Sequence, residues 1–177
     1  MYSACRKMGE APYMKKLYMI GGPMGVGKTT VCGILKKKLQ RCVFLDGDWC
    51  WNSEPFISTD ETRQMVFDNI CFLLGKFLRC GEYENIVFCW VMHQDGIIDG
   101  ILKRLDLKDA EVKKISLVCT PEELVRRLKS DIAAGARSED VILRALDRLP
   151  LYGGLDTLKI DVSDITAEET ADIIMGL

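Results

Sequence analysis

The sequence predicts a three-layer α/β fold in which a five-stranded parallel sheet is flanked by helices and carries a small lid. Two observations predict it. Short apolar runs alternate with segments whose apolar residues recur at helical spacing, and the first run leads through a glycine-rich stretch into a helix. Strands that alternate with helices are joined by right-handed crossovers, which make the sheet parallel and place helices on both faces. The 177 residues suffice for one domain with a substantial core.

Five short apolar runs are the expected strands. They cover residues 17–20, 43–45, 86–92, 112–118 and 158–162. The third run is continuously apolar between polar residues, which is typical of a strand buried on both faces.

Six segments with helical periodicity follow the strands. They cover residues 31–39, 59–78, 97–105, 120–128, 141–148 and 166–174. Residues 58–61, Ser-Thr-Asp-Glu, offer an N-cap for the second helix, Thr120 and Thr166 are expected N-cap residues, and Glu169 completes a capping box with Thr166. Residues 138–140 are expected to cap the fifth helix.

The chain from 14 to 177 is interpreted as a single domain, and residues 1–13, which lack a clear period, as an N-terminal tail or extension. A lid is expected at about 130–140. Residues 133–136 there are small, and Gly135 supplies a hinge.

The composition is that of an ordinary soluble protein, with 48% hydrophobic residues, 28% charged residues and a net charge of −2. No strongly basic balance points to nucleic acid, and no apolar run is long enough to cross a membrane. The N-terminus lacks the apolar core of a signal peptide, which favours a cytoplasmic protein. The protein is expected to be a monomer or a homodimer. Eight cysteines and one histidine form no zinc pattern, so the cysteines are interpreted as reduced and structural.

The residues that follow the first expected strand form the phosphate-loop pattern of glycine, four residues and Gly-Lys-Thr. Glycines leave room for backbone N–H groups to face a phosphate at the start of a helix. The lysine supplies a mobile charge, and the threonine hydroxyl is an oxygen ligand for Mg²⁺. The expected nucleotide-binding residues are Gly22, Pro23, Met24, Gly25, Val26, Gly27, Lys28, Thr29 and Thr30. The plainer alternative is a glycine-rich turn that binds nothing.

Polar residues also follow the next two strands. Asp46 and Asp48 come after the second strand, and His93 comes after the third. Ligands of parallel sheets bind beyond the carboxyl ends of the strands, so these residues are expected to share one cleft with the phosphate loop.

Three classes of phosphate-loop protein compete. A GTPase would need an Asn-Lys-x-Asp motif, which the sequence lacks. A motor ATPase would usually place an acidic residue at the end of a remote strand, where this chain has residues 90–93, Trp-Val-Met-His. A small-molecule kinase needs a metal-ordering acid, a base for the acceptor hydroxyl and mobile arginines. Asp46, Asp48 and the arginines between 137 and 148 meet these needs.

The sequence resembles the small phosphate-loop kinases of the nucleoside monophosphate kinase superfamily, especially the shikimate, gluconate and chloramphenicol kinase branch. The resemblance covers nearly the whole chain from Lys15. It rests on motifs in family order at 22–29, 45–48, 123–128, 148–152 and 160–163. It implies a P-loop NTPase fold and transfer of the γ-phosphate of ATP, with Mg²⁺, to a hydroxyl or phosphate of a small molecule or nucleotide.

The resemblance also implies roles for individual residues. Asp46 would order Mg²⁺ through water, and Asp48 would bind the acceptor hydroxyl and act as its base. Arg127 would stack on adenine, Arg137 would reach the transferring phosphate from the lid, and Arg148 would reach toward the acceptor.

The acceptor itself stays open. The family usually has glycine-rich or arginine-containing sequence after the third strand, where this chain has residues 90–94, Trp-Val-Met-His-Gln. His93 is either part of the acceptor site or a satisfied polar residue at a strand end. Trp49 and Trp51 suggest an aromatic wall for a planar or apolar acceptor, although either could belong to the core.

Two broader alternatives remain. Arg63, Arg144 and Arg148 could all lie on solvated helix faces, which is the usual position of an arginine. The protein could also be a regulator that binds a nucleotide through its phosphate loop without transferring phosphate to a small molecule.

Overall fold

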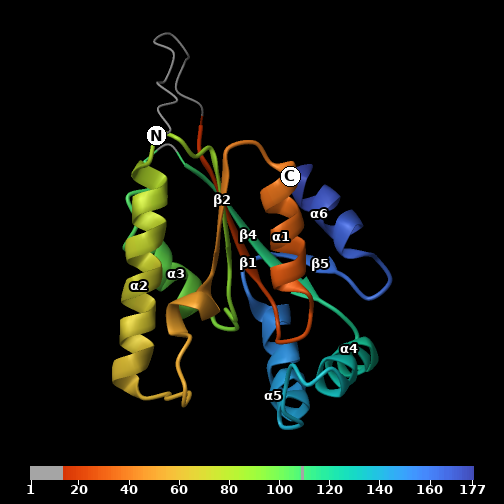
Figure 1. The fold of residues 1–177 in the computed structure, drawn as a ribbon. Coiled ribbons are helices and arrows are strands. Elements are labelled where there is room, and N and C mark those ends of the chain that lie inside the picture. Colours follow the sequence, from red (N-terminus) through yellow and green to blue (C-terminus); the bar gives the residue numbers. More distant parts are fainter. Residues whose placement is uncertain (1–13, 109) are drawn as a thin grey trace.

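A computed structural model describes residues 14–108 and 110–177, and the extension expected at 1–13 lies outside these residues. Five parallel strands form one sheet in the order β2-β3-β1-β4-β5 (Figure 1). The strands are β1 (Lys16–Gly21), β2 (Cys42–Asp46), β3 (Asn85–Cys89), β4 (Glu111–Val118) and β5 (Leu158–Asp161). The predicted three-layer α/β fold with a five-stranded parallel sheet is therefore confirmed.

Helices cover both faces of the sheet, as expected from the alternation. They are α1 (Lys28–Lys38), α2 (Asp60–Arg79), α3 (Asp95–Lys103), α4 (Pro121–Ala133), α5 (Val141–Arg148) and α6 (Ala167–Met175), with the 3₁₀ helices η1 (Gly47–Trp51) and η2 (Leu149–Gly154). The pair α2 and α3 lies on one face and the pair α1 and α6 on the other, while α4 and α5 lie toward the carboxyl ends of the strands (Figure 1).

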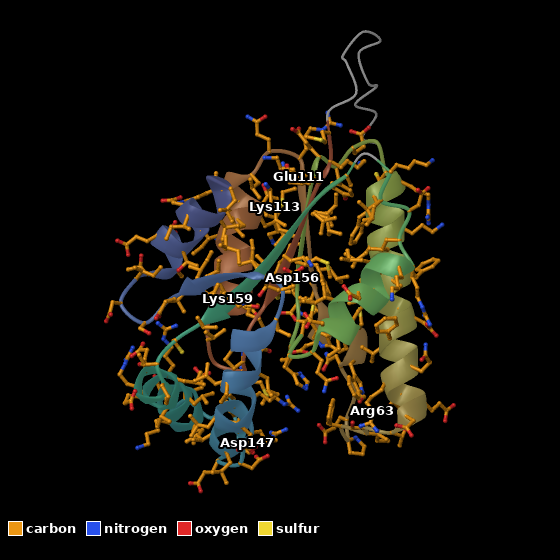
Figure 2. The ribbon with its side chains drawn as sticks, turned by 180° about the vertical axis from the view of Figure 1, so that it is seen from behind. Arg63, Glu111, Lys113, Asp147, Asp156 and Lys159 are labelled. Atoms are coloured by element: carbon orange, nitrogen blue, oxygen red, sulfur yellow. The ribbon has the colours of Figure 1, made fainter. Side chains whose placement is uncertain are left out.

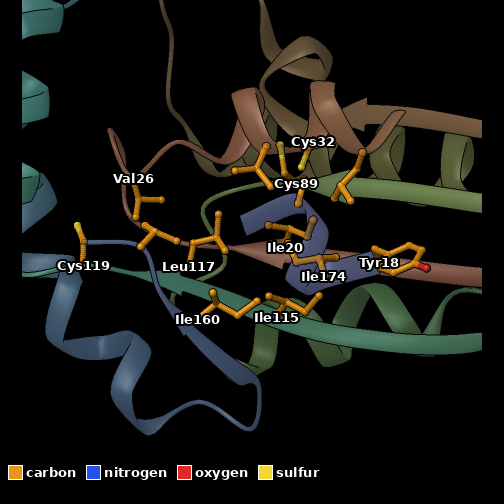
Figure 3. Packing of buried hydrophobic residues seen from close by; sticks show 14 of the residues in the cluster. Tyr18, Ile20, Val26, Cys32, Cys89, Ile115, Leu117, Cys119, Ile160 and Ile174 are labelled. Atoms are coloured by element: carbon orange, nitrogen blue, oxygen red, sulfur yellow. The ribbon is translucent and has the colours of Figure 1, made fainter. Parts of the chain in front are cut away.

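The central strand β1 is buried on both faces and divides the core in two. Leu17 and Met19 pack on the side of α2 and α3. Tyr18 and Ile20 belong to the cluster on the side of α1 and α6, which Figure 3 shows from close by. This alternation explains why β1 reads as a continuous apolar run, as parallel strands with two covered faces do.

The helix starts follow the predicted caps at three of four places. Thr59, Thr120 and Thr166 each accept a hydrogen bond from the backbone N–H of the third helical residue. Asp140 precedes α5 but makes no side-chain cap, because its carboxylate is engaged by Ser138 and Arg144 instead.

The apolar run at 86–92 is shorter as a strand than predicted. β3 ends at Cys89, and the Met92 N–H donates to the Trp90 carbonyl, so the chain turns there. Met92 is nonetheless fully buried. The apolar run continues past the strand because Trp90 and Met92 also pack into the core, although only residues up to 89 lie in the sheet.

The two ends of the strands have different surroundings. In Figure 2, Glu111 at the start of β4 lies at one end of the molecule, and Arg63 on α2 and Asp147 on α5 lie at the other. The latter is the end at which the phosphate-loop residues leave β1. Within 14–108 and 110–177, no helix has both the length and the apolar character needed to span a bilayer.

The different burial of two nearby residues of α2 predicts different effects of their substitution on the free energy of unfolding. Ile70 is fully buried, so Ile70→Ala should lower the free energy of unfolding by about 2–5 kcal/mol through lost contacts and a cavity. Phe72 is 61% exposed, so Phe72→Ala should change it by less than about 1 kcal/mol. Urea unfolding of both variants measures the difference. Equal losses would show that α2 is not packed through this face.

Candidate active site

The phosphate loop lies between β1 and α1 and needs its glycines for two reasons. Gly22 and Gly25 have φ values of 152° and 83°, which side-chain-bearing residues rarely adopt. A Cβ at Gly25 would also lie 2.5 Å from Cδ2 of Leu128. The residue before α1, Gly27, offers no side-chain cap, so the first backbone N–H groups of this helix are left for a ligand.

The side chain of Lys28 is held over the phosphate loop by carbonyl groups of the loop backbone. Its Nζ donates to the carbonyl oxygens of Gly22 and Pro23, each at 2.9 Å. Burial lowers the pKa of the ammonium group, while nearby groups that include the carboxylates of Asp48 and Asp46 oppose that change. The result is a desolvated cation beside the loop, where a phosphate would be bound.

Asp46 joins the loop to the second strand. Its Oδ2 accepts a hydrogen bond from Thr29 Oγ1 at 2.7 Å, and its Oδ1 accepts from the Asp48 N–H at 3.1 Å. The residue is only 6% exposed. A hydroxyl and a carboxylate oxygen thus lie side by side at the start of α1, and these are ligand types that Mg²⁺ prefers.

Asp48 lines the same cleft as Lys28 and interacts with it electrostatically. Burial of its carboxyl group among the cleft walls raises its pKa, and the Asp46 carboxylate raises it further, whereas Lys28, Trp90 and Arg137 oppose the rise. Gly47, directly before it, allows close packing of the Trp90 ring, because a Cβ there would lie 2.5 Å from Trp90 Cγ. The backbone that carries Asp48 is therefore fixed by the Trp90 ring.

The predicted site residues largely meet in one cleft of about 1220 Å³. Met24, Gly25, Gly27, Lys28, Thr29, Thr30, Asp46, Asp48, His93, Arg127, Arg137 and Arg148 all line it. Gly22, Pro23 and Val26 shape the phosphate loop from behind and do not line the cleft. Their carbonyl groups serve instead as acceptors for Lys28 and Arg127.

Trp49 is not among the residues that line the cleft, so the structure does not bring it together with the other predicted site residues. Its side chain turns outward and meets Phe44 edge-on, with ring centroids 5.0 Å apart. The reason is that residues 47–51 form a 3₁₀ helix, in which positions three apart share a face. Asp48 and Trp51 therefore line the cleft together, while Trp49 points elsewhere.

Aromatic and apolar residues that the sequence did not single out complete the cleft. They are Phe56 from the loop after η1, Phe67 from α2, Val91 after β3 and Ile97 from α3. One signal could have identified Phe67. It follows Arg63 by four residues and so shares its helix face, and both residues line the cleft.

Arg127 ties three elements together. Its guanidinium group donates to Glu123 within α4 at 2.6 Å, to the Val26 carbonyl of the loop at 2.9 Å and to the Val162 carbonyl after β5 at 2.6 Å. It therefore braces the phosphate loop, a role that the resemblance did not imply. Stacking of Arg127 on adenine stays a prediction.

The other cleft arginines differ in their partners. Arg63, Arg137 and Arg144 form ion pairs with Asp60, Asp131 and Asp140 at 2.7, 3.0 and 2.8 Å. Arg148 has no such pair among the described residues.

His93 lies beside Arg148. Burial lowers the pKa of this histidine and the Arg148 charge lowers it further, against a weaker effect of the Val91 carbonyl. Its Nδ1 is buried without a hydrogen bond of ordinary length within the described part of the chain. The imidazole is therefore neutral at pH 7 and faces a cleft with an unpaired guanidinium group.

Because Arg127 braces the phosphate loop and Arg126 does not, their substitutions should differ in their effects on nucleotide affinity and on stability. Arg127→Ala removes the donors of two backbone carbonyls and should lower nucleotide affinity at least about tenfold and the free energy of unfolding by about 1–3 kcal/mol. Arg126 pairs with the same Glu123 but is 70% exposed on its side chain, so Arg126→Ala should change stability by less than about 0.5 kcal/mol. Calorimetric titration with ATP and urea unfolding measure both effects. Indistinguishable variants would contradict the bracing role.

Comparisons with known proteins agree with this fold. No curated protein matches the chain. A Deinococcus radiodurans tunicamycin resistance protein shares the fold with a TM-score of 0.68 at 16% sequence identity, over 92% of this chain and 94% of that chain. A gluconokinase from Sinorhizobium meliloti 1021 shares it with a TM-score of 0.65 at 19% identity, over 91% of this chain and 88% of that chain. Shikimate kinase from Acinetobacter baumannii in complex with shikimate shares it with a TM-score of 0.59 at 19% identity, over 93% of this chain and 92% of that chain.

A family model described as an AAA domain matches residues 19–141. The matched region begins in β1 and includes the phosphate loop, Asp46, Asp48 and the whole of α4. The chain therefore belongs to this AAA domain family, and its fold is that of the P-loop kinases.

Proposed function

We propose that the protein is an ATP-dependent phosphotransferase that moves the γ-phosphate to a hydroxyl or phosphate of a small molecule or nucleotide. One observation carries the proposal. Lys28, the Thr29–Asp46 pair and Asp48 line the same cleft, so a phosphate site and a carboxylate with a raised pKa face each other. The fold shared with a gluconokinase and a shikimate kinase supports the same class of reaction.

One half of the cleft suits the nucleotide. The backbone N–H groups at the start of α1 would hold the β- and γ-phosphates, and Lys28 would exchange its carbonyl acceptors for phosphate oxygens. Thr29 and Asp46, whose oxygens already lie 2.7 Å apart, would hold Mg²⁺, with Asp46 acting through water. The metal ion would neutralise the charge of the phosphates. Arg127 keeps the loop in the conformation that this binding requires.

The other half suits the acceptor. Asp48 would orient the acceptor hydroxyl and take up its proton, for which a raised pKa makes it a better base at neutral pH. His93 and Arg148 would bind groups of the acceptor farther from the reacting oxygen. Arg137, within the segment expected as a lid, would reach the transferring phosphate when residues 130–140 close over it.

An acceptor screen tests this function against a regulator that only binds nucleotide. Coupled release of ADP is measured with nucleoside monophosphates, sugar acids and hydroxylated antibiotics. ADP formation that rises with one acceptor supports the phosphotransferase. Tight ATP binding without turnover across the whole panel would favour the regulator instead.

Lys28→Ala should reduce kcat by on the order of 10²–10³, because it removes a buried charge that stabilises the transferring phosphate. The fold should persist, because burial destabilises the ammonium group of Lys28 and its removal relieves that cost. The matched control is Lys36→Ala on the exposed side of α1, which should retain wild-type turnover. A folded Lys28→Ala variant with near-normal turnover would exclude the proposed reaction.

Asp48→Asn should lower kcat by on the order of 10²–10⁴, as expected for loss of a general base, with little change in ATP affinity. Asp46→Asn should instead show a defect that raised Mg²⁺ partly corrects, because its partner is the hydrated metal ion. Steady-state kinetics over a Mg²⁺ titration separate the two variants. Equal recovery of both variants would mean that Asp48 also serves the metal.

The pH dependence of kcat tests whether Asp48 acts as the base. Because its pKa is raised above the ordinary 3.8, its base form is lost as pH falls through that raised value, and kcat should fall with it. Asp48→Asn should lack this acidic limb. The raised pKa also means that the charged form destabilises the fold at pH 7, so Asp48→Asn should melt at a higher temperature there, and the difference should shrink as pH falls.

A further inference from the structure

We propose that the acceptor is a hydroxylated compound that combines a flat aromatic ring with an anionic group. This inference rests on the proposed function, because it assumes that the half of the cleft beyond Asp48 binds the acceptor. We call that half the acceptor side and define it by the cleft-lining residues Trp51, Phe56, Phe67, Trp90, His93 and Arg148.

Two aromatic side chains form one wall of the acceptor side. Trp51 and Phe56 have ring centroids 4.8 Å apart and planes tilted by 37°. The indole N–H of Trp51 donates to the Ile57 carbonyl at 3.2 Å, so the only polar atom of this side chain is already satisfied. What the wall offers a ligand is therefore apolar ring surface and no hydrogen bond, which suits an aromatic ring better than a polyol.

Two further aromatic side chains line the acceptor side, and their positions are fixed. Phe67 lies against Gly100, where a Cβ would be 3.0 Å from the ring, and the Arg104 guanidinium carbon lies 4.9 Å from its centroid. Trp90 packs on the backbone of Gly47. Rings held in place before binding lose little freedom when a ligand arrives, so an aromatic acceptor would meet a preformed slot.

The positive charge of Arg148 on the acceptor side favours a ligand with an anionic group. Arg148 is the cleft arginine without a carboxylate or carbonyl partner in the part of the chain that the structure describes, and it is half-buried. An uncompensated guanidinium group in such a place is costly, and a carboxylate or phosphate would compensate it with paired hydrogen bonds. The neutral imidazole of His93 beside Arg148 adds a polar ring nitrogen to the acceptor side, and it carries no charge that would bind the anion in place of Arg148.

These features specify three points of recognition. The hydroxyl of the acceptor lies at Asp48, its ring lies between the aromatic walls, and its anionic group lies at Arg148. A neutral aromatic alcohol would leave Arg148 without a partner. A polyhydroxylated acid would place hydroxyl groups against ring surfaces that cannot satisfy them.

Isothermal titration calorimetry in the presence of a non-hydrolysable ATP analogue tests the two chemical requirements with matched probes. The probes are 4-(hydroxymethyl)benzoate, its neutral counterpart 4-(hydroxymethyl)benzamide and the hydroxylated ring acid quinate. The benzoate should bind at least about tenfold more tightly than either of the others, which corresponds to about 1.4 kcal/mol. Uridine 5′-monophosphate and uridine repeat the comparison with a phosphate as the anion and show which anion the site takes.

Variants assign the effect to the named residues. Trp51→Ala should weaken binding of the benzoate about tenfold, whereas Trp49→Ala, two residues away and outside the cleft, should leave it unchanged. Arg148→Gln should abolish the preference for the benzoate over the benzamide. Circular dichroism confirms that each variant is folded.

Three results would overturn the inference. These are tighter binding of quinate than of the aromatic anions, no binding of any aromatic anion, or an unchanged preference in Arg148→Gln. Phosphate transfer is measured separately by ADP release. Aromatic anions that bind but never increase ADP release would contradict the proposed function and leave the binding inference intact. ADP release with quinate alone would contradict only the inference.

Discussion

The hydrogen bond between Thr29 and Asp46 is the constraint on which the site depends, because it joins the start of α1, which follows β1, to the carboxyl end of β2. β1 and β2 are separated by β3 in the sheet, and the 2.7 Å contact spans this gap at the carboxyl edge. It requires that the three strands be parallel and in register, with Ile20 and Asp46 both opposite Cys89. The phosphate loop and the acidic residues then reach one cleft, and Arg127 fixes the loop from its other side.

Burial acts on the two reactive groups in opposite directions. It lowers the pKa of the Lys28 ammonium and raises the pKa of the Asp48 carboxyl, while the attraction between the two charges limits both changes. The cleft thus contains a cation and an anion that are each less stable in their charged forms than in water. Such groups reduce the stability of the fold, and they are suited to a site where charge is redistributed between phosphate and hydroxyl.

The sequence predicted those features that are encoded locally. The phosphate loop, its flanking strand and helix, and the caps at Thr59, Thr120 and Thr166 each depend on residues within a few positions of one another, and the alternation of strands and helices was enough to predict the sheet. Features that depend on tertiary contacts were missed. Trp49 and Trp51 were both expected in an aromatic wall, whereas the 3₁₀ helix turns Trp51 to the same side as Asp48 and leaves Trp49 outside the cleft. The ion pairs of Arg63 and Arg144 lie at helical spacings of three and four residues and could have been predicted, whereas the lack of an ion pair at Arg148 among the described residues depends on tertiary structure.

The central claim is that phosphate leaves ATP for an organic acceptor bound in this cleft, and the fate of labelled phosphate tests it most directly. The protein is incubated with ATP labelled with ³²P at the γ position, Mg²⁺ and each candidate acceptor, and the products are separated by chromatography. The account predicts that the label appears in a phosphorylated organic compound in an amount equal to the ADP formed. Label recovered only as inorganic phosphate, at a rate that no acceptor changes, would contradict it.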